Sequence, residues 1–359
     1  MPTQQIALEI RIHQLELFGH TVSDLSVRVQ REQENWQVDF DGASVRGQAT
    51  VANSASSIRM HLERLNLVSS AQRRLSRDID PARLPALWVH CDQFQYNGMD
   101  LGKMALYSAP HASGMRVKAL SFTAPDLQID AKGSWDLVRG RHATTLEATL
   151  KGQDLSAVMK RLAFDMRAME ASETEAEMRL RWLGTPTAFG IDKLNGKISL
   201  GITQGRLLDV EPRIGRIFGL LSFQSLQRRL SLDFDDLFKK GFAFDRITGN
   251  FQLDGGNAYT SDLTMVGPSA RVAISGRIGL ARRDYEQVAT VTPELASSLP
   301  VASALFGPVG AGVGAALLLA EQVFDSLPER IDGLVRRHYT ITGPWERPMV
   351  KTLKTQKRQ

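Results

Sequence analysis

A β unit is repeated three times along this sequence, and no other feature constrains the fold as strongly. The copies occupy residues 25–47, 101–133 and 247–276. Each opens with leucine or isoleucine, runs through stretches of alternating apolar and polar residues, and closes at a glycine (Gly47, Gly133 or Gly276). A repeated β unit with one apolar face is typical of an extended scaffold rather than of a compact catalytic domain.

The same alternation recurs outside the three copies. It covers residues 6–12, 146–150, 178–182 and 198–202, where the intervening residues are mostly polar or charged. Alternation over four to eight residues predicts a strand with one wet face and one apolar face. We therefore predict a mainly β fold, an extended, curved antiparallel sheet with a few amphipathic helices.

Helical patterns are few. Asp154 is placed to cap an amphipathic helix near 154–170, whose apolar face would run from Leu155 to Met169. Pro212 opens a second helical region, near 212–238. A weaker helical pattern lies between Ser57 and Asp78.

The run from Pro300 to Ala320 holds no charged residue. At roughly 20 residues it reaches the length that crosses a bilayer core. Glycines and Pro308 interrupt its first half, so a hydrophobic hairpin or an interfacial insertion fits better than a standard span. The predicted membrane-contact residues of this region are Leu305, Phe306, Val309, Val313, Leu317, Leu318 and Phe324.

The net charge of +5 comes entirely from the last part of the chain. Residues 326–359 contain eight basic and three acidic residues, and 8 − 3 = 5. A neutral body argues against a nucleic-acid surface, which needs a continuous basic stripe. The basic tail either meets anionic lipid headgroups or stays solvated.

The sequence predicts no catalytic, metal or cofactor site. The seven histidines are scattered without a pair at metal-ligand spacing, and the glycines of residues 307–314 lack the flanking βαβ pattern of a dinucleotide loop. In a strand, Cys91 would point to the face opposite His90 and Asp92. Cys91 is the only cysteine, which excludes an intramolecular disulfide.

So few helices cannot cover so many strands, which leaves two architectures open. The sheet either folds onto itself as a sandwich, which patterning alone favours, or curves into a groove whose apolar floor binds acyl chains. The predicted groove-lining residues are Val27, Val29, Val38, Phe40, Leu146, Leu180, Ile198, Leu200, Phe251, Leu253 and Ile274.

Residues 194–212 and 215–238 resemble the C-terminal region of the YhdP proteins, which belong to the AsmA-like group. The resemblance continues through residues 240–249, 267–276, 291–293 and 339–345. It is specific from about residue 184 to residue 350, and before that only the β-repeat style agrees.

This resemblance implies an envelope protein of Gram-negative bacteria. Members are long, anchored in the inner membrane near the N-terminus, and have a periplasmic body of repeating β-groove units that carries phospholipid toward the outer membrane. The implied partners are phospholipid, the inner and/or outer membrane and other envelope proteins, with no nucleic acid. Because residues 1–5 include no basic region followed by an apolar stretch, we expect no signal or anchor in this chain, which resembles a C-terminal fragment.

The predicted function is therefore a non-enzymatic segment of a bridge-like lipid transfer protein without a cofactor. The layout comprises a β-groove segment over 1–183, an AsmA-like β region over 184–298, and an apolar glycine-rich helical segment, final strand and basic tail over 299–359. The alternative is a structural or assembly module for outer-membrane biogenesis that carries no lipid.

Overall fold

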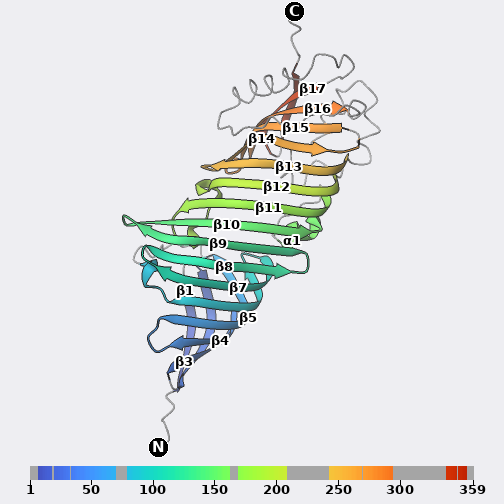
Figure 1. Cartoon of the computed structure of the whole chain (residues 1–359). Helices are drawn as coiled ribbons and strands as arrows, with labels where there is room; N and C mark the ends of the chain where they lie inside the picture. Colours follow the sequence, from blue (N-terminus) through green and yellow to red (C-terminus); the bar gives the residue numbers. More distant parts are fainter. Residues whose placement is uncertain are drawn as a thin grey trace, which may run out of the picture. The chain divides into compact units, whose positions relative to one another are not determined.

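The computed structural model describes residues 7–17, 20–32, 34–69, 79–161, 169–207, 242–268, 270–293, 337–345 and 347–353. Within these residues, 18 strands are assigned to one sheet and α1 (Leu155–Arg161) is the single α-helix (Figure 1). The prediction of a mainly β fold is confirmed. The strands are joined by pairing into one sheet, as predicted.

The chain divides into two compact units. Unit 1 takes its described residues from 1–151, 158–164 and 179–189, and unit 2 takes its own from 152–157, 165–178 and 190–359. The boundary passes through α1 and through β11 (Met169–Leu183).

Unit 1 is built from strands that follow one another along the chain. They are β1 (Ala7–Leu17), β2 (His20–Glu32), β3 (Asn35–Asp41), β4 (Val45–Ala52), β5 (Ser57–Ser69), β6 (Ala86–Tyr96), β7 (Met99–His111), β8 (Gly114–Ala124), β9 (Leu127–Val138) and most of β10 (Arg141–Gln153). From β1 to β9 each strand pairs antiparallel with the next, except that β5 and β6 are parallel.

The parallel pair requires a crossover between β5 and β6. The described end of this connection contains the short 3-10 helix η1 (Pro81–Arg83), which contacts β7, β8 and β9. Pro81 is fully buried. The crossover therefore covers part of the sheet that the strands alone would leave open.

Unit 2 contains residues 169–178 of β11 and a second ladder of strands. They are β12 (Asn195–Leu207), β13 (Phe242–Asp254), β14 (Asn257–Val266), β15 (Ala270–Gly279), β16 (Asp284–Pro293), β17 (Arg337–Pro344) and β18 (Met349–Leu353). Each pairs antiparallel with the next. In the sequence, the 3-10 helices η2 (Pro186–Ala188), in unit 1, and η3 (Ile191–Lys193), in unit 2, lie between β11 and β12.

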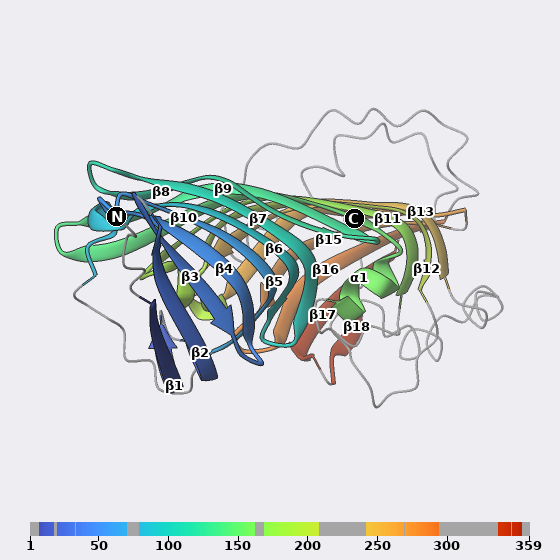
Figure 2. The ribbon, with the colours of Figure 1, turned by 90° about the horizontal axis from the view of Figure 1, so that it is seen from below.

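Several strands of unit 1 contain a one-residue slip in their apolar alternation. Leu62 and Leu65 of β5, and Cys91 and Phe94 of β6, lie three positions apart and yet belong to the same core. The pairing of β4 with β5 and of β6 with β7 shifts register at these points, as expected of β-bulges. Leu62 pairs with Cys91 and Leu65 with Phe94, so the slips are aligned. Because a bulge bends its strand, aligned bulges curve neighbouring strands together, as Figure 2 shows for β5 to β7.

The helical pattern predicted between Ser57 and Asp78 is wrong over the part that the structure describes, residues 57–69, which form strand β5. The slip explains the error. Apolar residues at 62 and 65 imitate helical spacing, although a bulge keeps both on one face of a strand.

The helix predicted near 154–170 is present only in part. Asp154 caps it as expected, because its Oδ1 accepts hydrogen bonds from the backbone N–H of Ser156 (3.0 Å) and Ala157 (3.3 Å). The helix is described to Arg161, and Met169 already belongs to β11, where alternation with buried Ala171 replaces the helical period. Residues 162–168, the helices predicted near 212–238 and the apolar run 300–320 lie outside the described residues.

The closing glycines of the three repeats share one structural role. A side-chain carbon at Gly47, Gly133 or Gly276 would collide with a backbone carbonyl oxygen of the next strand, that of His61, Thr145 or Glu286 respectively. Gly47 and Gly276 also have positive φ angles, of 141° and 125°. The repeat therefore specifies a position where two strands approach too closely for a side chain.

Replacing Gly276 by alanine is expected to lower the free energy of unfolding by at least about 2 kcal/mol, since the new carbon collides with backbone and the φ angle is strained. Gly201→Ala is the matched control, because Gly201 also lies in a strand of unit 2 and has open space around it. Denaturant unfolding measures both variants. Equal stability of the two would contradict the close-approach role.

Candidate functional site

The apolar face of unit 1 is built from rows of residues that pair directly from strand to strand. One row crosses β1 to β9 without interruption: Ile10, Val27, Phe40, Gly47, Leu62, Cys91, Met104, Phe122 and Ile129. A second row runs beside it: Leu8, Val29, Val38, Ala49, Met60, Val89, Leu106, Leu120 and Ala131. No charged side chain enters either row.

Exposure varies along this face. Leu62, Cys91 and Met104 are buried, whereas Phe40, Leu106 and similar residues are only half-buried. The half-buried residues still pack against the buried core. A face that is apolar, continuous and only partly covered by the described chain offers contact area to an apolar ligand.

The second half of α1 packs against this face in unit 1. Val158 is fully buried within the core, and Met159 packs against it. The Arg161 guanidinium holds the helix through Asp126, whose Oδ1 accepts from Nε (2.8 Å) and Nη2 (2.6 Å), and through Asp100, whose Oδ2 accepts from Nη1 (2.9 Å). The hydrogen bond to Asp126 raises the pKa of Arg161. Arg161 thus fastens α1 to the β8–β9 turn and the start of β7.

The apolar face of unit 2 is built in the same way. One row joins Ile202, Ile247, Met265, Val272 and Val291 across β12 to β16. Another joins Leu253, Ala258, Ile278, Tyr285 and Gly343 across β13 to β17. Between them, a row of Thr260, Gly276, Gln287 and Ile341 crosses β14 to β17 and includes polar residues.

The predicted groove-lining residues fall into two exposure classes. Val29, Val38, Phe40, Leu146, Ile198, Leu200 and Phe251 are half-buried, and Val27, Leu180, Leu253 and Ile274 are buried. The half-buried residues are the ones that a ligand on the face could reach directly. The predicted membrane-contact residues Leu305, Phe306, Val309, Val313, Leu317, Leu318 and Phe324 lie outside the described residues.

The opposite face of unit 1 is polar. Arg59 and Lys118 lie over Trp88 and Tyr107, 5.4 and 4.9 Å from the ring centroids, and these two aromatic rings stack at 5.0 Å. The stack spans β5 to β8 and uses the aromatic faces for cation–π contacts. The cation–π and stacking contacts therefore stabilise the sheet on this face, and the apolar residues lie on the opposite face.

The orientation predicted for Cys91 is confirmed. Cys91 is 0% exposed in the core, whereas His90 and Asp92 lie on the polar face with Nε2 and Oδ1 3.5 Å apart. Burial raises the pKa of the Cys91 thiol, which opposes formation of a thiolate nucleophile. Across the described residues, no group of three histidine, cysteine or carboxylate side chains is arranged to hold a metal ion.

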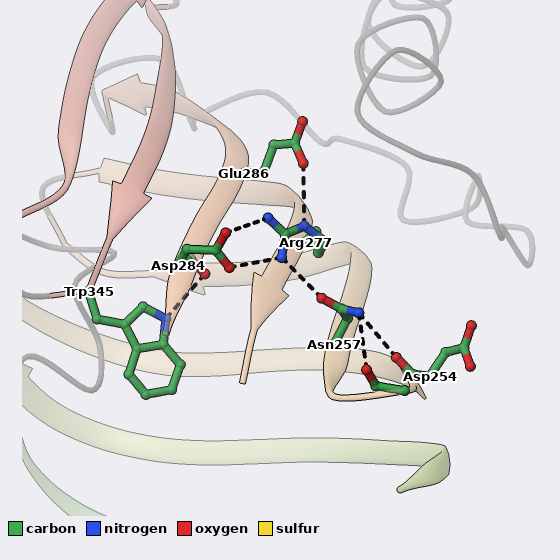
Figure 3. Close-up of polar contacts among 7 residues, drawn as sticks. Asp254, Asn257, Arg277, Asp284, Glu286 and Trp345 are labelled. Carbon is green, nitrogen blue, oxygen red and sulfur yellow. Dashed lines mark hydrogen bonds and ion pairs between the residues drawn. The ribbon is translucent and has the colours of Figure 1, made fainter. Parts of the chain in front are cut away.

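A polar network joins three turns of unit 2 (Figure 3). The Arg277 guanidinium donates to both carboxylate oxygens of Asp284 (2.9 Å each), to Oε2 of Glu286 (3.3 Å) and to Oδ1 of Asn257 (3.0 Å). The indole Nε1 of Trp345 donates to the backbone oxygen of Asp284 (3.2 Å). The network fastens the β13–β14, β15–β16 and β17–β18 turns to one another.

Acidification should weaken unit 2 through this network. The hydrogen bonds from Arg277 lower the pKa of Asp284 in the folded chain. Asp284 therefore adds stability above its unfolded pKa of about 3.9, and this contribution is lost as the pH falls through the lower folded value. We expect Asp284→Asn to flatten the loss of stability below about pH 5, measured by denaturant unfolding from pH 6 to 3. If Asp284→Asn has the same dependence of unfolding free energy on pH as the wild type, Asp284 does not contribute to acid sensitivity through its lowered pKa.

Two residues, Arg161 and Gln287, were not predicted from the sequence, because the spacing of apolar residues does not single them out. Arg161 reaches Asp126 across 35 positions of sequence, and no local pattern announces that pair. Gln287 stands at an inward position of an apolar alternation, between Tyr285 and Ala289. A polar residue at such a position is the one signal that could have singled it out.

Within the residues that the structure describes, no helix is both long and apolar enough to cross a membrane. Comparison with known proteins gives two matches. The sequence profile of the family described as YhdP protein matches residues 1–350. The intermembrane phospholipid transporter YhdP of Escherichia coli (strain K12) is 30% identical over 233 residues, which are 65% of this chain and 18% of that relative.

The chain thus spans less than a fifth of the length of this relative. No solved structure matches it. The family match covers both units and the three repeats, in agreement with the resemblance found between residues 184 and 350. This chain belongs to the YhdP protein family.

Proposed function

We propose that this chain is a segment of a lipid transfer protein and that its two apolar faces hold the acyl chains of phospholipid. One observation carries the proposal: apolar residues, several of them only half-buried, form unbroken rows across β1 to β9. The name of the Escherichia coli relative, an intermembrane phospholipid transporter, supports phospholipid as the ligand.

Chemistry favours acyl chains as the part of the lipid that lies on these faces. Each methylene removed from water contributes about 0.8 kcal/mol, so two long chains supply ample binding energy. A phosphate on the same rows would be costly, since no cationic side chain stands in them to pair with it. The headgroup therefore stays at the edge of the face while the chains follow the rows.

In this proposal the protein performs no chemistry and needs no cofactor. It works in the cell envelope, in contact with the outer membrane, the inner membrane or both, as part of a longer bridge between them. The predicted membrane-contact residues near 305–324 and the basic tail would provide the contact with a bilayer. Envelope proteins are the expected protein partners.

Site-specific photo-crosslinking tests the proposal, with neighbouring positions as matched controls. A benzophenone side chain at Leu106 or Leu120 faces the apolar rows, whereas one at the exposed neighbours Ala105 or Ala119 faces the polar side. We expect phospholipid adducts at the first pair only. Adducts at none of the four positions would favour the alternative, a structural or assembly module that carries no lipid.

A further inference from the structure

Gln287 is a neutral amide in the middle of the apolar face of unit 2. Its side chain is 1% exposed, and neither Nε2 nor Oε1 has a hydrogen-bond partner within the described part of the chain. A buried amide with both ends unpaired is unfavourable and uncommon in folded proteins. An apolar residue of similar size would avoid the free-energy cost of burying an unpaired amide. The presence of the amide therefore suggests that it has a hydrogen-bonding role.

The residues that pair directly with Gln287 supply no hydrogen-bond partner and no charge. It pairs with Gly276 of β15 on one side and with Ile341 of β17 on the other. Gly276 brings no side chain to the face, and Ile341 brings only carbon. The nearest polar residue of the row is Thr260, opposite Gly276, whose Oγ1 already donates to Asp262 (3.3 Å).

The single cation on the neighbouring part of β15 is also committed elsewhere. Arg277 lies on the other face of the sheet, next to Gly276, and pairs with Asp284 and Glu286. A phosphate beside Gln287 would therefore be buried without a positive partner, which is strongly unfavourable. The amide suits a neutral ligand group instead, since it offers two N–H donors and one carbonyl acceptor.

A phospholipid contains one such group between its headgroup and its acyl chains, the ester carbonyl. We infer that a phospholipid lying on this face displaces the groups that bury Gln287, and that Nε2 of Gln287 then donates a hydrogen bond to an acyl ester carbonyl of the lipid. The inference rests on the proposed function and makes it more specific. Gln287 then acts as a fixed position along an otherwise uniform apolar surface, at which a lipid pauses with its ester region in register with the row of Thr260, Gly276 and Ile341.

A competition between two lipids tests the inference. The full chain is incubated with equal amounts of a diester phosphatidylethanolamine and its diether analogue, which has the same headgroup and chain lengths but lacks the carbonyls. Native mass spectrometry then measures the ratio of bound lipids. The chain has a second apolar face in unit 1, so the difference between the wild type and a Gln287 variant reports on this position.

We expect the wild type to favour the diester lipid by about fivefold at this position, the worth of one net hydrogen bond. Gln287→Leu and Gln287→Met should lose that part of the preference while still binding lipid. Ile341→Leu, a change of shape at the paired position, should keep it. Both Gln287 variants are measured, so that the test remains possible if one of them does not fold.

Three results would overturn the inference. A wild-type ratio of one overturns it whatever the variants do. An equal preference in the wild type and in a folded Gln287 variant overturns it, and if Gln287→Leu is also more stable, the amide is a buried polar group that no ligand satisfies. Absence of any bound lipid in the wild type overturns the proposed function as well, whereas the first two results leave that function standing.

Discussion

Aspartate at Leu253 is expected to unfold unit 2, whereas aspartate at Phe251 leaves the unit folded and removes its bound phospholipid. The two residues lie on the same strand and the same face. Leu253 is 3% exposed and pairs with Ala258, so a charge there has no route to water. Phe251 is half-buried opposite Ile198, so its carboxylate can stay hydrated.

The expected magnitudes follow from burial. An unpaired charge at Leu253 should cost about 4 kcal/mol or more, a large part of the stability of an ordinary domain. At Phe251 the cost should stay near about 1 kcal/mol, while a carboxylate among acyl chains opposes lipid binding directly. Circular dichroism, denaturant unfolding and native mass spectrometry measure fold, stability and bound lipid.

Gln252→Asp is the matched control for both variants, because Gln252 lies between them and is exposed on the other face. It should change neither stability nor lipid content. Phe251→Asp protein that is folded and still carries the wild-type amount of lipid would contradict a role of this face in binding acyl chains.

Removal of the Arg161 guanidinium is expected to release α1 from unit 1. Arg161→Met keeps most of the side-chain length but leaves the largely buried Asp126 carboxylate without its partner. Loss of one member of such a pair should cost about 3 kcal/mol. Arg83→Met is the control, since Arg83 pairs with Asp80 at the surface with 87% of its side chain exposed, and it should cost less than about 0.5 kcal/mol.

Cys91 provides a local readout of this release. It is 0% exposed and belongs to the same core as Val158 of α1. We expect a maleimide to label Cys91 faster in Arg161→Met than in the wild type or in Arg83→Met, under conditions where all three remain folded. Equal labelling rates together with equal unfolding free energies would show that Arg161 does not hold α1 in place.

The alternating pattern predicts most of the strands and which side chains share a face, because the period of two is a property of each strand alone. The repeat also singles out the closing glycines, although the close approach of backbones at these glycines is seen only in the structure. The pairing partners of Gly47 and Gly276 are strands that follow in the chain, so the repeat carries the local topology as well.

The failures come from interactions that the period of two does not encode. Bulges shift the alternation by one residue, and at Leu62 and Leu65 this shift reads as helix. A single curved sheet and a sandwich have the same alternation, and they differ in bulges and in the pieces that cover the apolar face, here Val158 of α1. Arg161 and its partner Asp126 come from distant parts of the sequence, and only the folded chain brings them together.

The central claim is that the apolar faces of this chain bind phospholipid acyl chains. Its most direct test is native mass spectrometry of the purified full chain, stripped of lipid with detergent, returned to buffer and offered phospholipid vesicles. We predict that the folded chain takes up discrete phospholipid masses, and that Phe251→Asp reduces the number bound. A folded, lipid-free wild-type chain that takes up no phospholipid would contradict the claim.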